Sequence, residues 1–181
     1  NFIYEYWKNK SYDKIKYPKF NNYFFGYWHK IRNLNVIKKD VDRLIINKNL
    51  KKRKLKKIIS IINKNTAFIH IRGGDYLLRK NSQFNVCDQK YFKKALNKLK
   101  KFKKINTYHI ITNDINYAKK IIKSIKLDKP IFFLKRFKLN VLEEFSIQTQ
   151  YRYGIISNSN FSYIPTFFSK KRLLTIAPKN E

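Results

Sequence analysis

Residues 70–76, with the sequence HIRGGDY, bring together side chains that could bind a phosphorylated ligand. The guanidinium of Arg72 can hold a pyrophosphate through paired hydrogen bonds, and it keeps its charge at any working pH. Gly73 and Gly74 allow the backbone to approach a ligand where a side chain would collide. The carboxylate of Asp75 could accept hydrogen bonds from ribose hydroxyls or from the N–H groups of a purine base.

Two later segments, TND at 112–114 and SNSNFS at 157–162, add hydroxyl, amide and carboxylate groups. Ser and Asn at the start of a helix can bind anionic oxygens together with free backbone N–H groups. Together with residues 70–76, these two segments supply groups that suit a phosphorylated ligand with a sugar and a base. Each segment also has a structural interpretation: His70 as a buried core histidine, TND as a strand-to-helix turn, and SNSNFS as a capping loop. Because all three follow expected strands, we favour the functional interpretation.

A regular alternation of strands and helices positions these segments. Apolar, β-branched runs predict strands at 67–71, 107–112, 131–134, 154–157 after a glycine turn, and 173–177. Helical periodicity predicts helices at 88–103 with Asp88 as N-cap, 115–126, 141–153 and 159–168. Such repeated units imply an α/β fold, a Rossmann-like parallel sheet with helices on both faces. Ligands of such sheets bind beyond the carboxyl ends of the strands.

The first 64 residues have a different character. Residues 1–30 are rich in aromatic side chains and irregular, whereas 31–62 look helical in two pieces around 47–49. Residues 50–62, with the sequence LKKRKLKKIISII, predict an amphipathic helix with a solvated basic face. The carboxylates of Asp40 and Asp42 fall at an expected helix start and are interpreted as helix N-terminal charge, not as a metal site.

The net charge of +31 raises the alternative of a basic module that binds nucleic acid or another polyanion without catalysis. Most basic residues are lysines spread along the chain, and Ile, Asn, Phe and Tyr are also abundant. These are the residues of A- and T-rich codons, so genome composition alone can produce this surface. No specific nucleic acid is therefore expected. Peripheral contact of the basic helix with acidic lipid headgroups is a second alternative.

The remaining composition narrows the class of protein. Cys87 is the lone cysteine, so an internal disulfide is excluded and a reducing, cytoplasmic compartment is expected. The sequence holds no apolar run near the roughly 18 residues of a membrane-spanning helix. The chain contains no Met, which indicates a chain whose beginning is missing.

The segment HIRGGDY at 70–76 resembles the H-x-R-x-G-D-Y motif of the α-1,2-fucosyltransferases, glycosyltransferase family 11. SNSNFS at 157–162 is similar to that family's later S-N-S-S-F-S motif. FFGYWHK at 24–30, TND at 112–114 and TIAP at 175–178 resemble further family segments, and all five occur in family order.

The resemblance implies one half of a GT-B glycosyltransferase. Residues 65–181 would form the carboxyl-terminal Rossmann-like domain that binds the donor GDP-fucose, and residues 1–64 a partial amino-terminal, acceptor-side region. Fucose would pass to a hydroxyl of a galactose-terminated glycan with inversion and without a metal or other cofactor. The donor-binding residues would be His70, Arg72, Gly74, Tyr76, Thr112, Asn113, Asp114, Ser157, Asn158, Ser159, Phe161 and Ser162.

By the resemblance, Arg72 would hold the donor pyrophosphate, and His70 and Asp75 would help to order the donor site. As a hypothesis for catalysis, Arg72 stabilises the charge that develops on the leaving GDP, and Asp75 is the base for the acceptor hydroxyl. Glu143 and Glu144 are alternative bases. Two positions depart from the family pattern: Gly73 stands where a second arginine is usual, and Tyr163 with Ile164 replaces a Trp pair. A remnant that binds GDP but transfers nothing is a further alternative.

Overall fold

The structure is a computed structural model that describes residues 2–4, 23–25, 31–78, 86–127 and 129–178. The chain divides into two compact units, Asn1–Lys38 and Lys39–Glu181. In the first unit β1 (Phe2–Tyr4) pairs in parallel with β2 (Tyr23–Phe25), where the sequence predicted irregular structure. The rest of the aromatic segment at 24–30, from residue 26 on, lies outside the described residues. The domain boundary after residue 64 stays a prediction.

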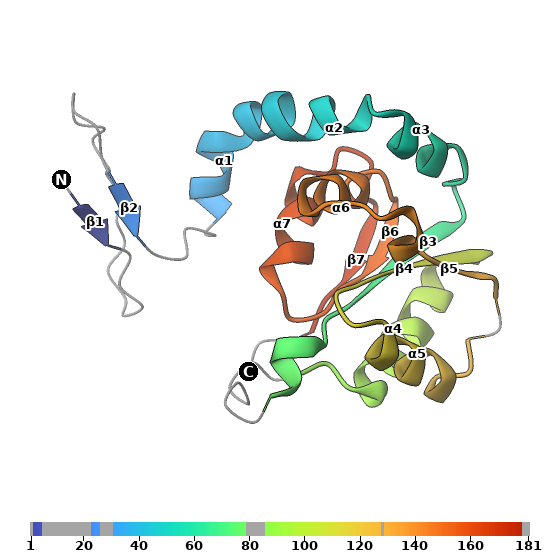
Figure 1. Cartoon of the computed structure of the whole chain (residues 1–181). Coiled ribbons are helices and arrows are strands. Elements are labelled where there is room, and N and C mark those ends of the chain that lie inside the picture. Colours follow the sequence, from blue (N-terminus) through green and yellow to red (C-terminus); the bar gives the residue numbers. More distant parts are fainter. Residues whose placement is uncertain (1, 5–22, 26–30, 79–85, 128, 179–181) are drawn as a thin grey trace. The chain divides into compact units, whose positions relative to one another are not determined.

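The second unit is built on a five-stranded sheet in the order β5-β4-β3-β6-β7 (Figure 1). Every neighbouring pair is parallel. The strands are β3 (Thr66–Ile71), β4 (Thr107–Thr112), β5 (Ile131–Phe133), β6 (Tyr153–Ile155) and β7 (Leu174–Ile176). The predicted Rossmann-like parallel sheet is therefore confirmed.

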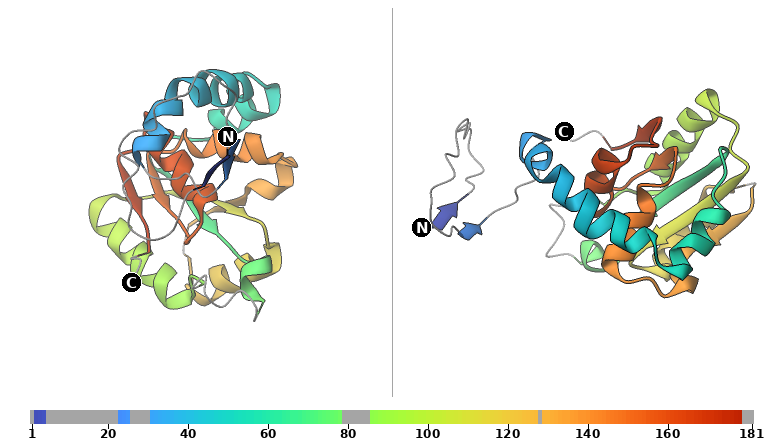
Figure 2. Two further views of the ribbon diagram at one scale, coloured as in Figure 1. Left: turned by 90° about the vertical axis from the view of Figure 1, so that its left-hand side faces the viewer. Right: turned by 90° about the horizontal axis from the view of Figure 1, so that it is seen from above.

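Helices cover both faces of the sheet, as predicted (Figures 1 and 2). α4 (Gln89–Phe102) and α5 (Ile115–Ser124) pack on the face that receives Ala67, Ile69 and Ile71 of β3. On the other face, Phe68 of β3 packs with residues of α3 (Arg53–Ser60) and α6 (Val141–Gln148), next to α7 (Asn160–Phe168). The alternation follows from the strand geometry, in which successive side chains point to opposite faces.

Polar side chains fix where these helices begin. Asp88 accepts a hydrogen bond from the Tyr91 N–H of α4 at 2.9 Å, which confirms the predicted N-cap. Asn140 and Glu143 form a reciprocal capping box at the start of α6. Such caps satisfy backbone N–H groups that the helix itself leaves without a partner.

The helical segment at 31–62 breaks later than predicted. It runs through α1 (Ile31–Asp40), a π-helix η1 (Val41–Asn47) and α2 (Lys48–Leu50), and α3 starts only after Lys52. Asn49 lies within this helical run, and its buried side-chain amide donates to the Ile45 carbonyl at 2.8 Å. Asp40 and Asp42 consequently lie inside a continuous helical run and not at a helix start, which corrects the prediction.

α6 is shorter than its predicted range of 141–153, and β6 begins earlier than predicted. The guanidinium of Arg172 donates to the carbonyls of Gln148 at 2.7 Å and Tyr151 at 2.9 Å, which satisfies carbonyl groups where α6 stops. Gly154 lies inside β6 against Phe68 and Arg172, so the predicted glycine turn is wrong.

Candidate functional site

The ends of β3 and β6 lie side by side where the strand order changes direction. β4 and β5 extend the sheet on one side of β3, and β6 and β7 extend it on the other. Ligands of open parallel sheets bind at such a switch point. Ser157, just after β6, accepts a hydrogen bond from the Arg72 backbone N–H at 3.0 Å and donates to the His70 carbonyl at 2.8 Å. The segments 70–76 and 157–162 therefore meet.

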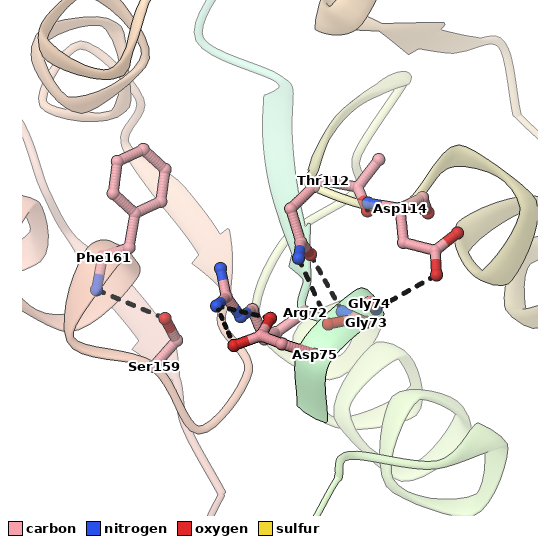
Figure 3. Close-up of polar contacts among 9 residues, drawn as sticks. Arg72, Gly73, Gly74, Asp75, Thr112, Asp114, Ser159 and Phe161 are labelled. Carbon is pink, nitrogen blue, oxygen red and sulfur yellow. Dashed lines mark hydrogen bonds and ion pairs between the residues drawn. The ribbon is translucent and has the colours of Figure 1, made fainter. Parts of the chain in front are cut away.

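Arg72 presents its guanidinium at this switch point, paired with Asp75 (Figure 3). Its Nη2 donates to both carboxylate oxygens, at 2.8 and 2.9 Å, and the guanidinium carbon lies 4.7 Å from the centre of the Tyr76 ring. The Nε of Arg72 is buried and has no hydrogen-bond partner among the described residues. Buried N–H donors normally have a hydrogen-bond partner in folded proteins. Because this one has none among the described residues, it can donate to an anionic oxygen of a ligand.

His70 supports the arginine from within the sheet. Its side chain is buried, and its ring centre lies 5.8 Å from that of Phe161. Burial, with the charge of Arg72 as a second cause, lowers the pKa of His70 to about 3. The imidazole is thus neutral near neutral pH, and Arg72 carries the positive charge of the pair.

The loop after β4 holds the two glycines through their backbones. The Gly73 N–H donates to Asn113 Oδ1 at 3.0 Å, and Asn113 Nδ2 returns a bond to the Gly73 carbonyl at 3.2 Å. The Gly74 N–H donates to Asp114 Oδ2 at 3.0 Å. Gly74 has φ +61°, a left-handed conformation that glycine adopts without the steric cost of a side chain. These contacts fix the path of the loop that carries Arg72 and Asp75.

The TND segment also makes the strand-to-helix turn that its structural interpretation predicted. Thr112 Oγ1 accepts from the Asp114 N–H at 3.0 Å and donates to the Asp114 carbonyl at 2.9 Å. Asp114 Oδ1 accepts from the Tyr117 N–H at the start of α5, at 3.0 Å. The N–H groups of Tyr117 and Gly74 hold the pKa of the Asp114 carboxyl below its usual value, although partial burial opposes them. Both of its oxygens are therefore already in use.

The start of α7 supplies the third part of the site. Ser159 caps the helix by accepting from the Phe161 N–H at 3.3 Å, and its carbonyl accepts from the Ser162 N–H at 3.1 Å (Figure 3). Asn158 is half-buried just before this turn. The N-terminus of a helix favours negative charge, so the start of α7 and the Arg72 guanidinium can bind the same anion.

Glu143, one of the two alternative bases, is occupied structurally. Its buried carboxylate bonds to Lys52 Nζ at 3.0 Å, Lys54 Nζ at 2.5 Å and the Asn140 N–H at 2.9 Å. Burial favours the neutral acid, but the hydrogen bonds from Lys54, Asn140 and Lys52 prevail and lower the pKa of Glu143 to about 2. This carboxylate ties α6 to α3 and is a weak proton acceptor.

Glu144, the other alternative base, has the opposite character. Burial raises the pKa of its carboxyl to about 7, with Lys135 opposing the shift. One turn later, Gln148 Nε2 donates to the carbonyls of Phe161 at 3.2 Å and Glu144 at 3.3 Å, which places this side of α6 against α7. From the sequence, Glu143 and Glu144 both rank behind Asp75, and residue spacing alone does not show which of the two is buried.

Replacing Glu144 with Gln is expected to stabilise the protein at about pH 8 by roughly 1–2 kcal/mol, allowing for solvent screening at a partly exposed carboxyl. The folded-state pKa of Glu144, about 7, exceeds the ordinary carboxyl value of 4.5, so the contribution of this group to stability is present below pH 4.5 and is lost as the pH rises through 7. The gain of the variant should therefore vanish at about pH 4. Urea unfolding at both pH values measures it.

Glu143→Gln is the matched control and should have the opposite sign. The folded-state pKa of Glu143, about 2, lies below the ordinary carboxyl value of 4.5, so the contribution of this group to stability is present above pH 4.5 and disappears as the pH falls through 2. Destabilisation by Glu144→Gln at about pH 8 would contradict the raised pKa.

The described residues contain no group of three or more His, Cys, Asp or Glu side chains arranged to hold a metal ion. Within the same part of the chain, no helix combines the length and the apolar character needed to cross a bilayer.

Comparison with solved structures finds the same fold in other proteins. The crystal structure of POFUT1 in complex with GDP-fucose matches with a TM-score of 0.59 at 10% identity, over 86% of this chain and 53% of that chain. POFUT1 in complex with GDP matches with a TM-score of 0.54 at 11% identity, over 86% and 54%. The chain thus spans about half the length of these structures, and at this identity the likeness shows the fold. No curated protein sequence matches the chain.

Comparison of the sequence with models of protein families gives a match over nearly the whole chain. The model of glycosyl transferase family 11 matches residues 2–181, and this range includes every motif at the switch point. The fold, the motifs and the extent of this match agree, and the chain belongs to glycosyltransferase family 11.

Proposed function

We propose that the chain binds GDP-fucose and acts as the donor-binding part of an inverting fucosyltransferase, with the 2-hydroxyl of a galactoside as acceptor and no metal. Membership of glycosyltransferase family 11 and the likeness to POFUT1 in complex with GDP-fucose support this proposal. One observation carries it. Arg72 lies at the switch point of the sheet with a buried Nε that has no partner among the described residues.

Arg72 and the start of α7 would hold the pyrophosphate of the donor. A guanidinium binds two phosphate oxygens in a fixed geometry, and the helix N-terminus adds a favourable field. Gly73 and Gly74 keep side chains away from this anion. The backbone contacts of Asn113 and Asp114 hold the loop in place before the donor arrives, which reduces the ordering cost of binding.

Glu144 is the carboxylate best suited to recognise guanine. Guanine presents adjacent N1–H and N2–H donors, which a carboxylate can accept together, whereas adenine and uracil lack this pair. The oxygens of Asp114 are engaged by backbone N–H groups, and those of Glu143 by lysines. The Glu144 carboxylate accepts no hydrogen bond from the described residues and lies on α6 beside the Phe161 segment.

In the transfer step, the acceptor oxygen forms a bond to the anomeric carbon of fucose as the bond from that carbon to the β-phosphate oxygen breaks. The electron pair of the broken bond leaves with GDP, and attack from the opposite face inverts the configuration. Arg72 stabilises the added negative charge. The proton of the acceptor hydroxyl passes to a carboxylate, for which Asp75 is the proposed group.

Asp75→Asn is expected to lower kcat for fucosyl transfer by about 100- to 10,000-fold, the range for loss of a general base. GDP affinity should change by less than about tenfold, since ion pairs between partly exposed side chains contribute little. Here the exposed fractions are 26% for Arg72 and 53% for Asp75. A transfer assay with a galactoside acceptor and calorimetric titration with GDP measure the two effects. An unchanged kcat would assign Asp75 a structural role.

Titration of the purified chain with GDP, UDP and ADP tests donor binding directly. Calorimetry at about 0.15 M and about 0.5 M salt separates a specific site from general attraction to a basic surface. Selective binding of GDP at both salt concentrations is expected. Equal, salt-quenched binding of all three nucleotides would overturn the proposal and favour the polyanion-binding alternative.

A further inference from the structure

A cavity lined by basic side chains lies at the opposite end of the strands from Arg72. A cavity of about 540 Å³ is formed where the chain enters three strands: Ile62 to Lys64 before β3, Gln150 and Arg152 before β6, and Lys170 to Leu173 before β7. Because all strands are parallel, these are the amino ends, and the proposed donor site is at the carboxyl ends. β3 has six residues, so the amino and carboxyl ends of the strands are about 20 Å apart.

The walls of the cavity are cross-linked by hydrogen bonds. Arg172, between the lining residues Lys171 and Leu173, donates to the carbonyls of Tyr151 and Gln148. The Leu173 N–H donates to the Arg152 carbonyl at 2.8 Å. These bonds fix the segment 170–173 against the segment that carries Gln150 and Arg152, so both cavity walls keep their relative positions.

The turn before β3 is equally well held. The Asn63 N–H donates to Thr66 Oγ1 at 3.1 Å, and the Thr66 N–H donates to the Asn63 carbonyl at 3.1 Å. The Asn65 N–H adds a bond to Asn63 Oδ1 at 2.8 Å. The third wall is therefore ordered by its own backbone and brings Lys64 to the rim in a defined position.

The charged side chains that line this cavity are all positive. Lys64, Arg152, Lys170 and Lys171 line it, and none of the described lining residues carries a carboxylate. Lys170 pairs with Asp42 at 3.2 Å, whereas the side chains of Lys64, Arg152 and Lys171 bond to no residue of the described part of the chain. Like charges gathered in a hollow repel one another and lower the stability of the empty protein. A bound anion would remove that repulsion.

We propose that this cavity binds a ligand with two or more phosphate charges. A volume of about 540 Å³ falls within the range of ligand sites, about 300–1,000 Å³, and exceeds what a single phosphate fills. The cations approach from three separate segments, as a ligand with several anionic oxygens requires. The side chains of Ile62 and Leu173, the latter 66% exposed, give the rim an apolar part beside the cations. A soluble diphosphate and the phosphate headgroup of a lipid share this chemistry.

The test uses inorganic pyrophosphate and the chain with Arg72→Ala, so that binding at the carboxyl edge does not contribute. Arg152→Gln with Lys171→Gln removes two cavity cations, both on exposed side chains whose loss should leave the fold intact. Lys119→Gln with Lys120→Gln on exposed positions of α5 is the matched control with the same change in net charge. Calorimetry at about 0.15 M salt is expected to show binding weakened about tenfold or more by the cavity pair and less than about twofold by the control pair.

Vesicles identify the source of the phosphate. Co-sedimentation with vesicles of phosphatidylglycerol and phosphatidylcholine, and with phosphatidylcholine alone, is measured for the same variants. Binding to the anionic vesicles that the cavity pair abolishes and the control pair leaves intact would support the proposal with a lipid headgroup as the source. Pyrophosphate binding alone, with the same dependence on the cavity pair, would support it with a soluble source. Equal effects of the two pairs on both probes would overturn it.

Discussion

Replacing Arg72 with Ala is expected to weaken GDP binding by about 100-fold, because a guanidinium–pyrophosphate contact comprises two charge-assisted hydrogen bonds. Arg72→Lys keeps the charge but loses the paired geometry, so its expected loss is intermediate, about tenfold. Calorimetric titration with GDP at about 0.15 M salt measures both. The midpoint of urea unfolding should change little, since the pair of Arg72 with Asp75 is partly exposed to solvent.

The control for Arg72→Ala is Arg53→Ala. Arg53 is exposed at the start of α3, and its loss changes the net charge by the same amount. GDP affinity of this variant should stay within about twofold of the wild type, because interactions with distant exposed charges are screened. If Arg53→Ala weakened GDP binding as much as Arg72→Ala does, the overall positive charge would account for the binding and the proposed donor site would fail.

Arg172→Met is expected to have the largest effect on folding, a loss of about 2–4 kcal/mol in the free energy of unfolding. The guanidinium is held by carbonyls and threonine hydroxyls and lies 4.7 Å from the centre of the Phe68 ring. Burial lowers the pKa of Arg172 to about 10, with Tyr151 opposing the shift, so the group remains charged at neutral pH. Methionine fills similar space but leaves the carbonyls of Gln148 and Tyr151 without this donor.

Thermal unfolding of Arg172→Met should show a Tm lower by about 5–15 °C, given the usual relation between stability and Tm for chains of this size. Lys171→Met is the neighbouring control and should stay within about 0.5 kcal/mol of the wild type, because Lys171 is exposed and bonds to no described residue. An unchanged Tm for Arg172→Met would mean that water or nearby side chains replace the guanidinium at the two carbonyls.

Much of the sheet could be predicted because its signals are local. The apolar run at 66–71, the capping residues Asp88 and Ser159 and the polar segments after the strands all lie next to the elements that they define. The place of β6 beside β3 could not be predicted. That pairing joins strands more than 80 residues apart, as the contact of Arg72 with Ser157 shows, and it brings two of the polar segments together.

The remaining differences share a physical cause, which is contact between distant parts of the chain. α6 stops at Gln148 where Arg172, 24 residues later, bonds to its carbonyl. The unlike environments of Glu143 and Glu144 arise because lysines at 52 and 54 reach the first carboxylate, whereas the second is half-buried and has no such ion pair among the described residues. Periodicity reports the spacing of side chains along an element, and it carries no information on which neighbours the fold brings to them.

The crowding around Gly73 limits how this site can change through evolution. A Cβ atom at this position would lie 2.9 Å from both Asp114 Cβ and Tyr117 Cδ1, closer than side-chain carbons normally approach. An arginine at this position therefore cannot be accommodated without displacing the start of α5. A smaller side chain at 117 would remove only one of the close contacts, because the Cβ atoms of Asp114 and Tyr117 would still lie 2.9 and 3.1 Å away. A side chain at position 73 therefore requires the backbone at the start of α5 to move, so a second guanidinium here would come together with a displaced TND turn.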